Sequence, residues 1–163
     1  MKRSIDTLTS DSHTLIVTCR TSFRAEEFLQ SKATVVCVAG RDVHPLNVDL
    51  HYVLRQEIAT RSIHRLALVV DGTATEAGMA SVSQHPAFGY EGPFPFIDFI
   101  NQRTVLEQFV AQHANTLLSL HFIRKKVNEG TLRLMGYLFD PKLRMAEEVY
   151  CNGWSINSAF DAN

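Results

Sequence analysis

Cysteine is scarce in this chain of 163 residues: Cys19, Cys37 and Cys151 are the only three, and they lie far apart in sequence. An odd number of widely spaced cysteines does not make a disulfide framework, and it is typical of proteins kept in a reducing compartment. The cysteine content therefore predicts a cytoplasmic protein.

Long apolar runs and an excess of charge are absent as well. No stretch approaches the roughly 20 apolar residues that cross a membrane, and the run 14–18 that follows the basic start is too short for a signal peptide. The formal net charge is -1, so the composition favours neither nucleic acid nor a membrane surface as a partner.

What the chain does contain is the composition of an ordinary globular protein, with 45% hydrophobic and 20% charged residues. The length fits one domain that spans residues 1–163. Residues 1–12 are polar and expected to be loose, and residues 152–163 are expected to form a polar C-terminal tail.

Short apolar runs alternate with helical patterns along the first half of the chain. The runs 15–19, 33–39 and 66–70 have the length and composition of buried strands. Between the second and third runs, apolar residues are spaced for one face of a helix, namely Leu50, Val53, Leu54 and Ile58. Strands that alternate with helices pair in parallel through right-handed crossovers, so the sequence predicts an α/β fold.

The second half of the chain predicts a helical region, a strand and a closing hairpin. Apolar residues recur at helical spacing from Arg103 onward, and Gly130 is placed to end the helical region. Residues 131–139 alternate as in a strand, and a turn begins at Asp140-Pro141. Residues 145–150 form the last predicted strand, which is expected to pair antiparallel because the connection is short.

One segment, residues 85–96, is rich in Gly, Pro and aromatic residues, which indicates a loop rather than a regular element. Its aromatic side chains are Phe88, Tyr90, Phe94 and Phe96. They require burial, either against this chain or against a second chain.

The turn after the third predicted strand is the first place to look for a site. A strand that ends in a Gly turn and feeds a helix lies at the carboxyl edge of the sheet, where open α/β folds hold their sites. Thr73 and Glu76 match the capping box Ser/Thr-X-X-Glu, in which each side chain bonds the backbone N–H of the other residue. Such a cap typically contributes ~1 kcal/mol. The spacing therefore favours a helix start over a catalytic role for Glu76.

Five segments, taken in this order and spacing, resemble the β-class carbonic anhydrases. Residues 15–22 resemble the family's strand that ends in Cys-X-Asp-Ser-Arg, and residues 35–41 its strand that ends in Arg-Asn-Ala-Gly-Asn. Residues 50–54 fall where the family has a Leu-Glu-Tyr-Ala helix, residues 68–78 resemble the strand that ends in Gly-His-X-X-Cys-Gly, and residues 130–140 resemble the late strand before the closing hairpin.

This resemblance implies a mainly parallel sheet in the strand order 2-1-3-4 with an antiparallel strand at the edge, flanked by helices. It also implies a homodimer or a dimer of dimers. The family binds a catalytic zinc through Cys, His and Cys, which hold the ion in a tetrahedral array with one open position.

The family's ligand positions are mostly changed in this sequence. Cys19 stands at the first ligand position, but Thr73 stands at the position of the His and Glu76 at that of the second Cys. Thr21 and Phe23 replace the Asp–Arg pair with which the family orients the zinc-bound water. Because a hydroxyl is a poor zinc ligand and one thiolate with one carboxylate holds the ion weakly, we expect no zinc cofactor and no catalytic residues.

The residues expected to line the cleft at the family's active-site positions are Cys19, Thr21, Ser22, Phe23, Arg41, Gly72, Thr73 and Glu76. We expect a carbonic-anhydrase-like protein with a degenerate zinc site and no CO2 hydration activity. Such a protein would act as a binding, regulatory or assembly module, with a small anion or a protein as its partner.

Two alternatives stay open. The first is an enzyme of altered chemistry in the same cleft, with Cys19 as a nucleophile or with a non-standard metal site of Cys19 and Glu76. The second is a non-catalytic subunit that assembles with an active paralogue.

Overall fold

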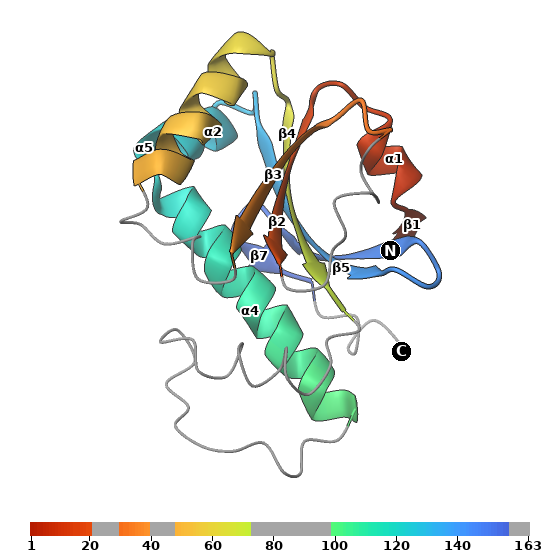
Figure 1. Cartoon of the computed structure of the whole chain (residues 1–163). Coiled ribbons are helices and arrows are strands. Elements are labelled where there is room, and N and C mark those ends of the chain that lie inside the picture. The colour runs from red at the N-terminus through yellow and green to blue at the C-terminus, as the bar shows by residue number, and fades with distance from the viewer. Residues whose placement is uncertain (21–29, 40–47, 73–98, 157–163) are drawn as a thin grey trace.

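A mixed β-sheet runs through the molecule, and helices cover it on both faces (Figure 1). The computed structural model describes residues 1–20, 30–39, 48–72 and 99–156. The strands are β1 (Lys2–Ser4), β2 (Thr14–Arg20), β3 (Thr34–Ala39), β4 (Arg65–Asp71), β5 (Arg133–Asp140), β6 (Met145–Cys151) and β7 (Trp154–Ser155). The helices are α1 (Asp6–Thr9), α2 (Val48–Thr60), α4 (Phe99–Ser119) and α5 (His121–Asn128).

The strand order is β1-β6-β5-β4-β2-β3, and β7 pairs with β6 as well. The four strands from β3 to β5 are parallel, and β6 is antiparallel to β5. These four are the four predicted parallel strands, so the predicted order 2-1-3-4 is confirmed. The α/β fold with a mainly parallel sheet is confirmed with it.

The expectation that residues 1–12 are loose is wrong. β1 pairs antiparallel with β6, and Lys2 lies opposite Glu147. Ile5 and Leu8 are each only 2% exposed, because they pack on the sheet face that α1 covers. The composition of this segment is polar, but these two apolar residues are spaced to dock one short helix.

The position of the antiparallel strand also differs from the expectation. β6 does not form the edge of the sheet, because β1 pairs along residues 145–147 and β7 along residues 150–151 of its outer side. Residues 154–155 of the predicted C-terminal tail (152–163) are therefore part of the sheet, while residues 157–163 lie outside the described ranges.

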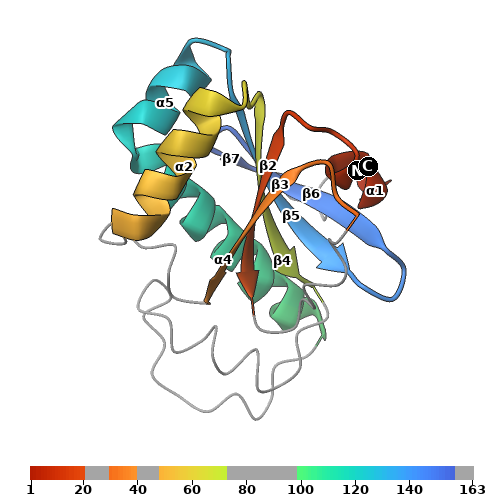
Figure 2. The same ribbon diagram turned by 45° about the horizontal axis from the view of Figure 1, so that its top comes forward.

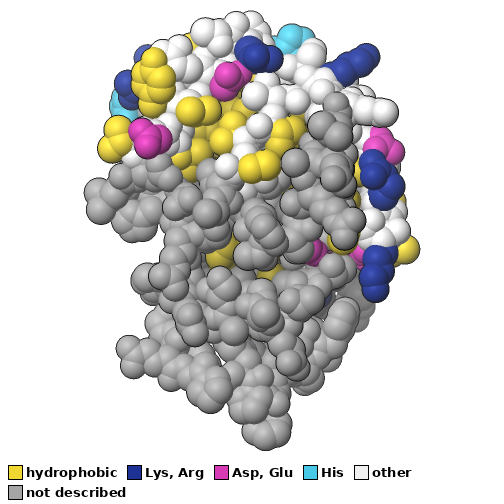
Figure 3. Space-filling model, viewed as in Figure 1, with side chains coloured by type: hydrophobic (Ala, Val, Ile, Leu, Met, Phe, Trp, Pro, Cys, Tyr) yellow, Lys and Arg dark blue, Asp and Glu magenta, His cyan; other side chains and the backbone are white. Residues whose placement is uncertain are grey.

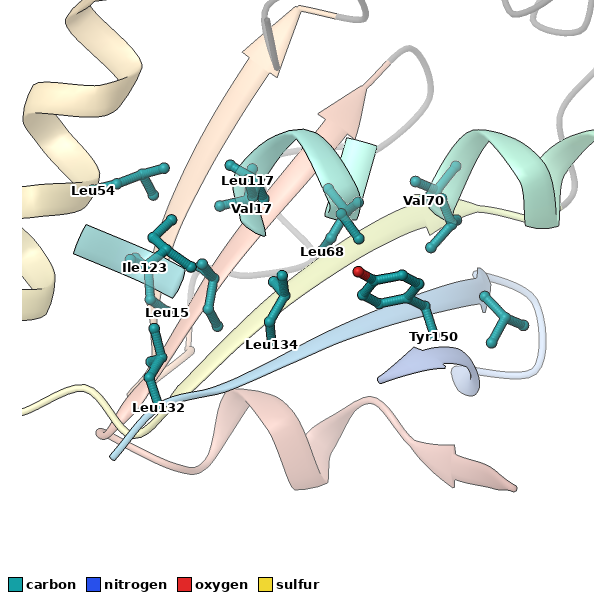
Figure 4. Packing of buried hydrophobic residues seen from close by; sticks show 14 of the residues in the cluster. Leu15, Val17, Leu54, Leu68, Val70, Leu117, Ile123, Leu132, Leu134 and Tyr150 are labelled. Atoms are coloured by element: carbon teal, nitrogen blue, oxygen red, sulfur yellow. The ribbon is translucent and has the colours of Figure 1, made fainter. Parts of the chain in front are cut away.

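One face of the sheet is covered by α2, α4 and α5, and the other carries α1 (Figure 2). Leu54 of α2, Leu117 of α4 and Ile123 of α5 point onto the strands in Figure 4, and all three are 1% exposed or less. The predicted face of α2 is confirmed for Leu54 and its buried neighbours, whereas Val53 is 37% exposed and lies at the margin. None of the described helices has the length and apolar character needed to cross a membrane.

Gly136 of β5 allows α4 to approach the sheet closely. A Cβ atom at Gly136 would overlap Val110 Cγ1 of α4 and would lie 3.0 Å from Tyr150 Cβ of β6. The contact is between buried groups, so the helix has little room to move away.

Gly136→Ala is therefore expected to lower the free energy of unfolding by about 1–3 kcal/mol, the usual cost of overpacking a core. Urea denaturation followed by circular dichroism measures this change. Gly72→Ala is the matched control, since a Cβ at Gly72 meets its nearest neighbours at 3.4 Å. Equal losses in the two variants would contradict the close approach of α4.

Candidate functional site

The carboxyl ends of β2, β3 and β4 lie together at one edge of the sheet (Figure 1). Cys19 is the second-last residue of β2, and the register places it opposite Val38 of β3 and Val70 of β4. Cys19 therefore stands between two strand ends, at the edge where α/β folds hold their sites. This arrangement follows from the confirmed parallel order of these strands.

The turn after β4 is anchored to the neighbouring strand. The N–H of Gly72 donates a hydrogen bond to the carbonyl oxygen of Phe139, at 2.8 Å. Asp71, the last residue of β4, is 8% exposed and lies opposite Phe139. Gly72 thus lies at a fixed point, two residues past the position opposite Cys19.

The structure describes only part of the predicted cleft. It gives the backbone position of Cys19 and all of Gly72, and it brings these two strand ends together. The other six predicted residues lie outside the described ranges, namely Thr21, Ser22, Phe23, Arg41, Thr73 and Glu76. The capping box at 73–76 and the aromatic segment 85–96 lie outside them too.

One buried polar side chain close to the strand ends, that of Thr18, was not predicted from the sequence. Thr18 of β2 lies beside Val69 of β4, which lies beside Tyr137 of β5. Thr18 is fully buried, and within the described ranges its Oγ1 has no hydrogen-bond partner. A buried hydroxyl of this kind costs about 1–3 kcal/mol. The only signal in the sequence was a threonine inside an apolar strand.

Tyr137 is the titratable residue among these three neighbours. Its side chain is 1% exposed, and its hydroxyl donates to Met135 Sδ at 3.3 Å. Burial, aided by the carboxylate of Glu148 on β6, raises the pKa of Tyr137 from its usual 10.0 to about 12. The neutral phenol is therefore the form that the folded protein stabilises.

We expect the free energy of unfolding to fall as the pH rises from about 10 to about 12, by at most about 1.4 kcal/mol per pH unit. The sign follows because the unfolded chain releases the Tyr137 proton first, so alkaline pH favours unfolding. Urea denaturation at several alkaline pH values measures the slope. Tyr137→Phe removes the titrating group, and an unchanged slope in this variant would assign the effect to other residues.

Among the described residues, no group of three or more His, Cys, Asp or Glu side chains is arranged to hold a metal ion. The residues that the sequence alignment puts at the family's three ligand positions are Cys19, Thr73 and Glu76, which offer one thiol, one hydroxyl and one carboxylate. This set does not fit a catalytic zinc, which is held by three strong nitrogen, sulfur or carboxylate ligands.

Neither protein-family models nor curated protein sequences match the chain. Solved structures of β-carbonic anhydrases do. A tetrameric β-carbonic anhydrase from the filamentous ascomycete Sordaria macrospora is similar over 86% of this chain and 82% of that chain, with a TM-score of 0.63 and 12% identity.

Two further structures give the same result. A mutant of the β-carbonic anhydrase CafD from Aspergillus fumigatus is similar over 92% of this chain and 98% of that chain, with a TM-score of 0.64 and 10% identity. The Coccomyxa β-carbonic anhydrase in complex with acetazolamide is similar over 86% of this chain and 73% of that chain, with a TM-score of 0.62 and 12% identity. At these identities the similarity shows the fold alone, and the fold is that of the β-carbonic anhydrases.

Proposed function

We propose that this chain, which has the β-carbonic-anhydrase fold, binds no catalytic zinc at the family's position and does not hydrate CO2. It acts instead as a binding, regulatory or assembly module. The observation that carries the proposal is the register of β2 with β4, which sets Cys19 beside Val70. This register supports the sequence alignment in which Thr73 and Glu76 occupy the two remaining ligand positions.

Loss of the zinc removes the chemistry on which the family's reaction rests. A bound zinc ion lowers the pKa of its water to about 7, and that water becomes the nucleophile. A thiol, a hydroxyl and a carboxylate without the ion supply no comparable nucleophile for CO2. The cleft therefore remains as a surface at a sheet edge, and we propose a small anion or a protein as its ligand.

The test is the zinc content of freshly purified, untagged protein, measured by plasma mass spectrometry beside a zinc-containing β-carbonic anhydrase treated in the same way. We expect negligible zinc at the strand ends and no CO2 hydration above the uncatalysed rate. Stoichiometric zinc that disappears in Cys19→Ala would overturn the proposal.

The alternative in which Cys19 is a nucleophile has a separate test. Cys37 is exposed and Cys151 is half-buried, so both serve as internal references for the rate of alkylation in the native protein. Our proposal expects Cys19 to react no faster than Cys37. A much faster reaction would favour an enzyme of altered chemistry, because a reactive thiol is one that is accessible and ionised.

We also propose a cytoplasmic homo-oligomer, a dimer or a dimer of dimers. Hydrophobic side chains gather over α2 and β3 in Figure 3, and on α2 Val48 and Tyr52 are 74% and 64% exposed. Large apolar side chains in a group are typical of a contact surface. The solved β-carbonic anhydrases of Sordaria macrospora, described as tetrameric, support assembly in general. A single species with the mass of one chain in sedimentation velocity would contradict it.

A further inference from the structure

Two histidines lie side by side at the end of the sheet opposite to Cys19. His13 immediately precedes β2 and His64 immediately precedes β4, and these strands start in register with Thr14 opposite Arg65. The N–H of His64 donates a hydrogen bond to the carbonyl of His13, at 2.9 Å. Both side chains are exposed, and their ring centres are 5.2 Å apart.

The ring of His13 is oriented by the backbone. Its Nδ1 lies 3.2 Å from the carbonyl oxygen of Ser62. Since a carbonyl only accepts, Nδ1 must donate the hydrogen, and in the neutral ring Nε2 then keeps its lone pair. A ring N–H bonded to a backbone carbonyl is the usual support of a histidine that binds a metal.

The backbone at Ser62 has a φ of 51°, in the left-handed region that residues other than glycine rarely adopt. Such a conformation persists only where surrounding contacts maintain it. This conformation directs the Ser62 carbonyl to the His13 ring, so the turn after α2 fixes the orientation of the ring.

A carboxylate and a guanidinium group of opposite charge lie beside this pair. The carboxylate of Asp11 accepts from the backbone N–H of His13 and from Thr14 Oγ1, each at 2.9 Å. Arg65 lies 3.6 Å from this carboxylate, and the two charges offset each other.

We propose that His13 and His64 together bind one divalent metal ion of the late first-row series, with water in the remaining positions. Two imidazoles that bind one ion at about 2.0–2.1 Å per nitrogen and a tetrahedral angle place their ring centres roughly 5 Å apart. The observed 5.2 Å fits this geometry. Imidazole suits Cu²⁺, Ni²⁺ and Zn²⁺, and the order of affinity at such a site places Cu²⁺ first.

The ion would link the N-terminal ends of β2 and β4, which lie at the opposite end of these strands from Cys19. No third His, Cys, Asp or Glu side chain among the described residues completes the ligand set. Binding is therefore exchangeable and weaker than at a structural site with four protein ligands. Because the ion binds the folded register of two strands, it also raises the melting temperature.

The test is calorimetric titration of the full-length, untagged protein with Cu²⁺ and with Ni²⁺, paired with melting curves. We expect one ion per chain and tighter binding of Cu²⁺. His13→Gln and His64→Gln are each expected to weaken binding by at least about tenfold, because a single imidazole no longer chelates. His121→Gln, at an exposed histidine of α5, is the matched control and should change nothing.

The unmodified protein offers a second readout. Substoichiometric Cu²⁺ should broaden the ring proton signals of His13 and His64 before those of His121. Equal broadening of all three, or unchanged affinity in both variants, would overturn the proposal. Metal that is retained in His13→Gln but lost in Cys19→Ala would instead contradict the proposed function, so the two failures are distinct.

Discussion

Leu8→Ala is expected to lower the free energy of unfolding by about 2–5 kcal/mol. Leu8 is 2% exposed, and α1 places it in the apolar cluster that also contains Ile5, Ile16 and Tyr137. The smaller side chain leaves a cavity that a helix of only four residues fills poorly. Urea denaturation followed by circular dichroism is the suitable measurement, since Trp154, the only tryptophan, is 79% exposed and reports weakly on the core.

Leu143→Ala is the control for this prediction, because it makes the same chemical change in the turn between β5 and β6. Leu143 is 67% exposed, so a loss of no more than about 0.5 kcal/mol is expected. If the two variants are equally stable, then α1 does not dock as described and residues 1–12 are loose after all.

The double variant Thr73→His, Glu76→Cys is expected to change the zinc content from almost none to about one ion per chain. Together with Cys19 it would recreate the Cys, His, Cys ligand set of the family that the chain resembles. The fixed position of Gly72, whose N–H donates a hydrogen bond to the Phe139 carbonyl, supports this alignment. Plasma mass spectrometry after dialysis against a weak chelator measures the gain.

The control is the same pair of substitutions in a Cys19→Ala background, which should lose the ion again. The double variant is not expected to hydrate CO2 rapidly, because the sequence alignment puts Thr21 and Phe23 at the positions of the family's Asp–Arg pair. If zinc does not bind even when all three ligands are present, then the turn after β4 does not hold residues 73 and 76 where the alignment puts them.

The central strands were predictable because each is marked locally. The apolar run 66–70, which is followed by Asp71-Gly72, and the run 15–19 with its β-branched residues each show a strand in the sequence itself. The order of these strands in the sheet was not marked locally. Alternation of strands and helices predicts parallel pairing, whereas the order 2-1-3-4 was predicted from the family resemblance. The structure confirms both.

Features that depend on distant pairings were not predictable. Lys2 and Glu147 come together only because β1 reaches β6. His13 and His64 likewise become neighbours only through the register of β2 with β4, and in sequence each reads as an isolated surface histidine. The burial of Thr18 depends on what packs over its strand, which no local pattern records.

The pairing of β1 with β6 has a kinetic consequence. β1 and β6 come from opposite ends of the described chain, so their contact closes a very long loop. The conformational entropy of this loop is lost in one step. Such contacts tend to form late in folding, after β4, β5 and the β5–β6 hairpin have assembled. Weakening β1 or α1 should therefore speed unfolding and leave the folding rate almost unchanged. The contacts of the N-terminal segment would then control the unfolding rate, and with it the lifetime of the native state.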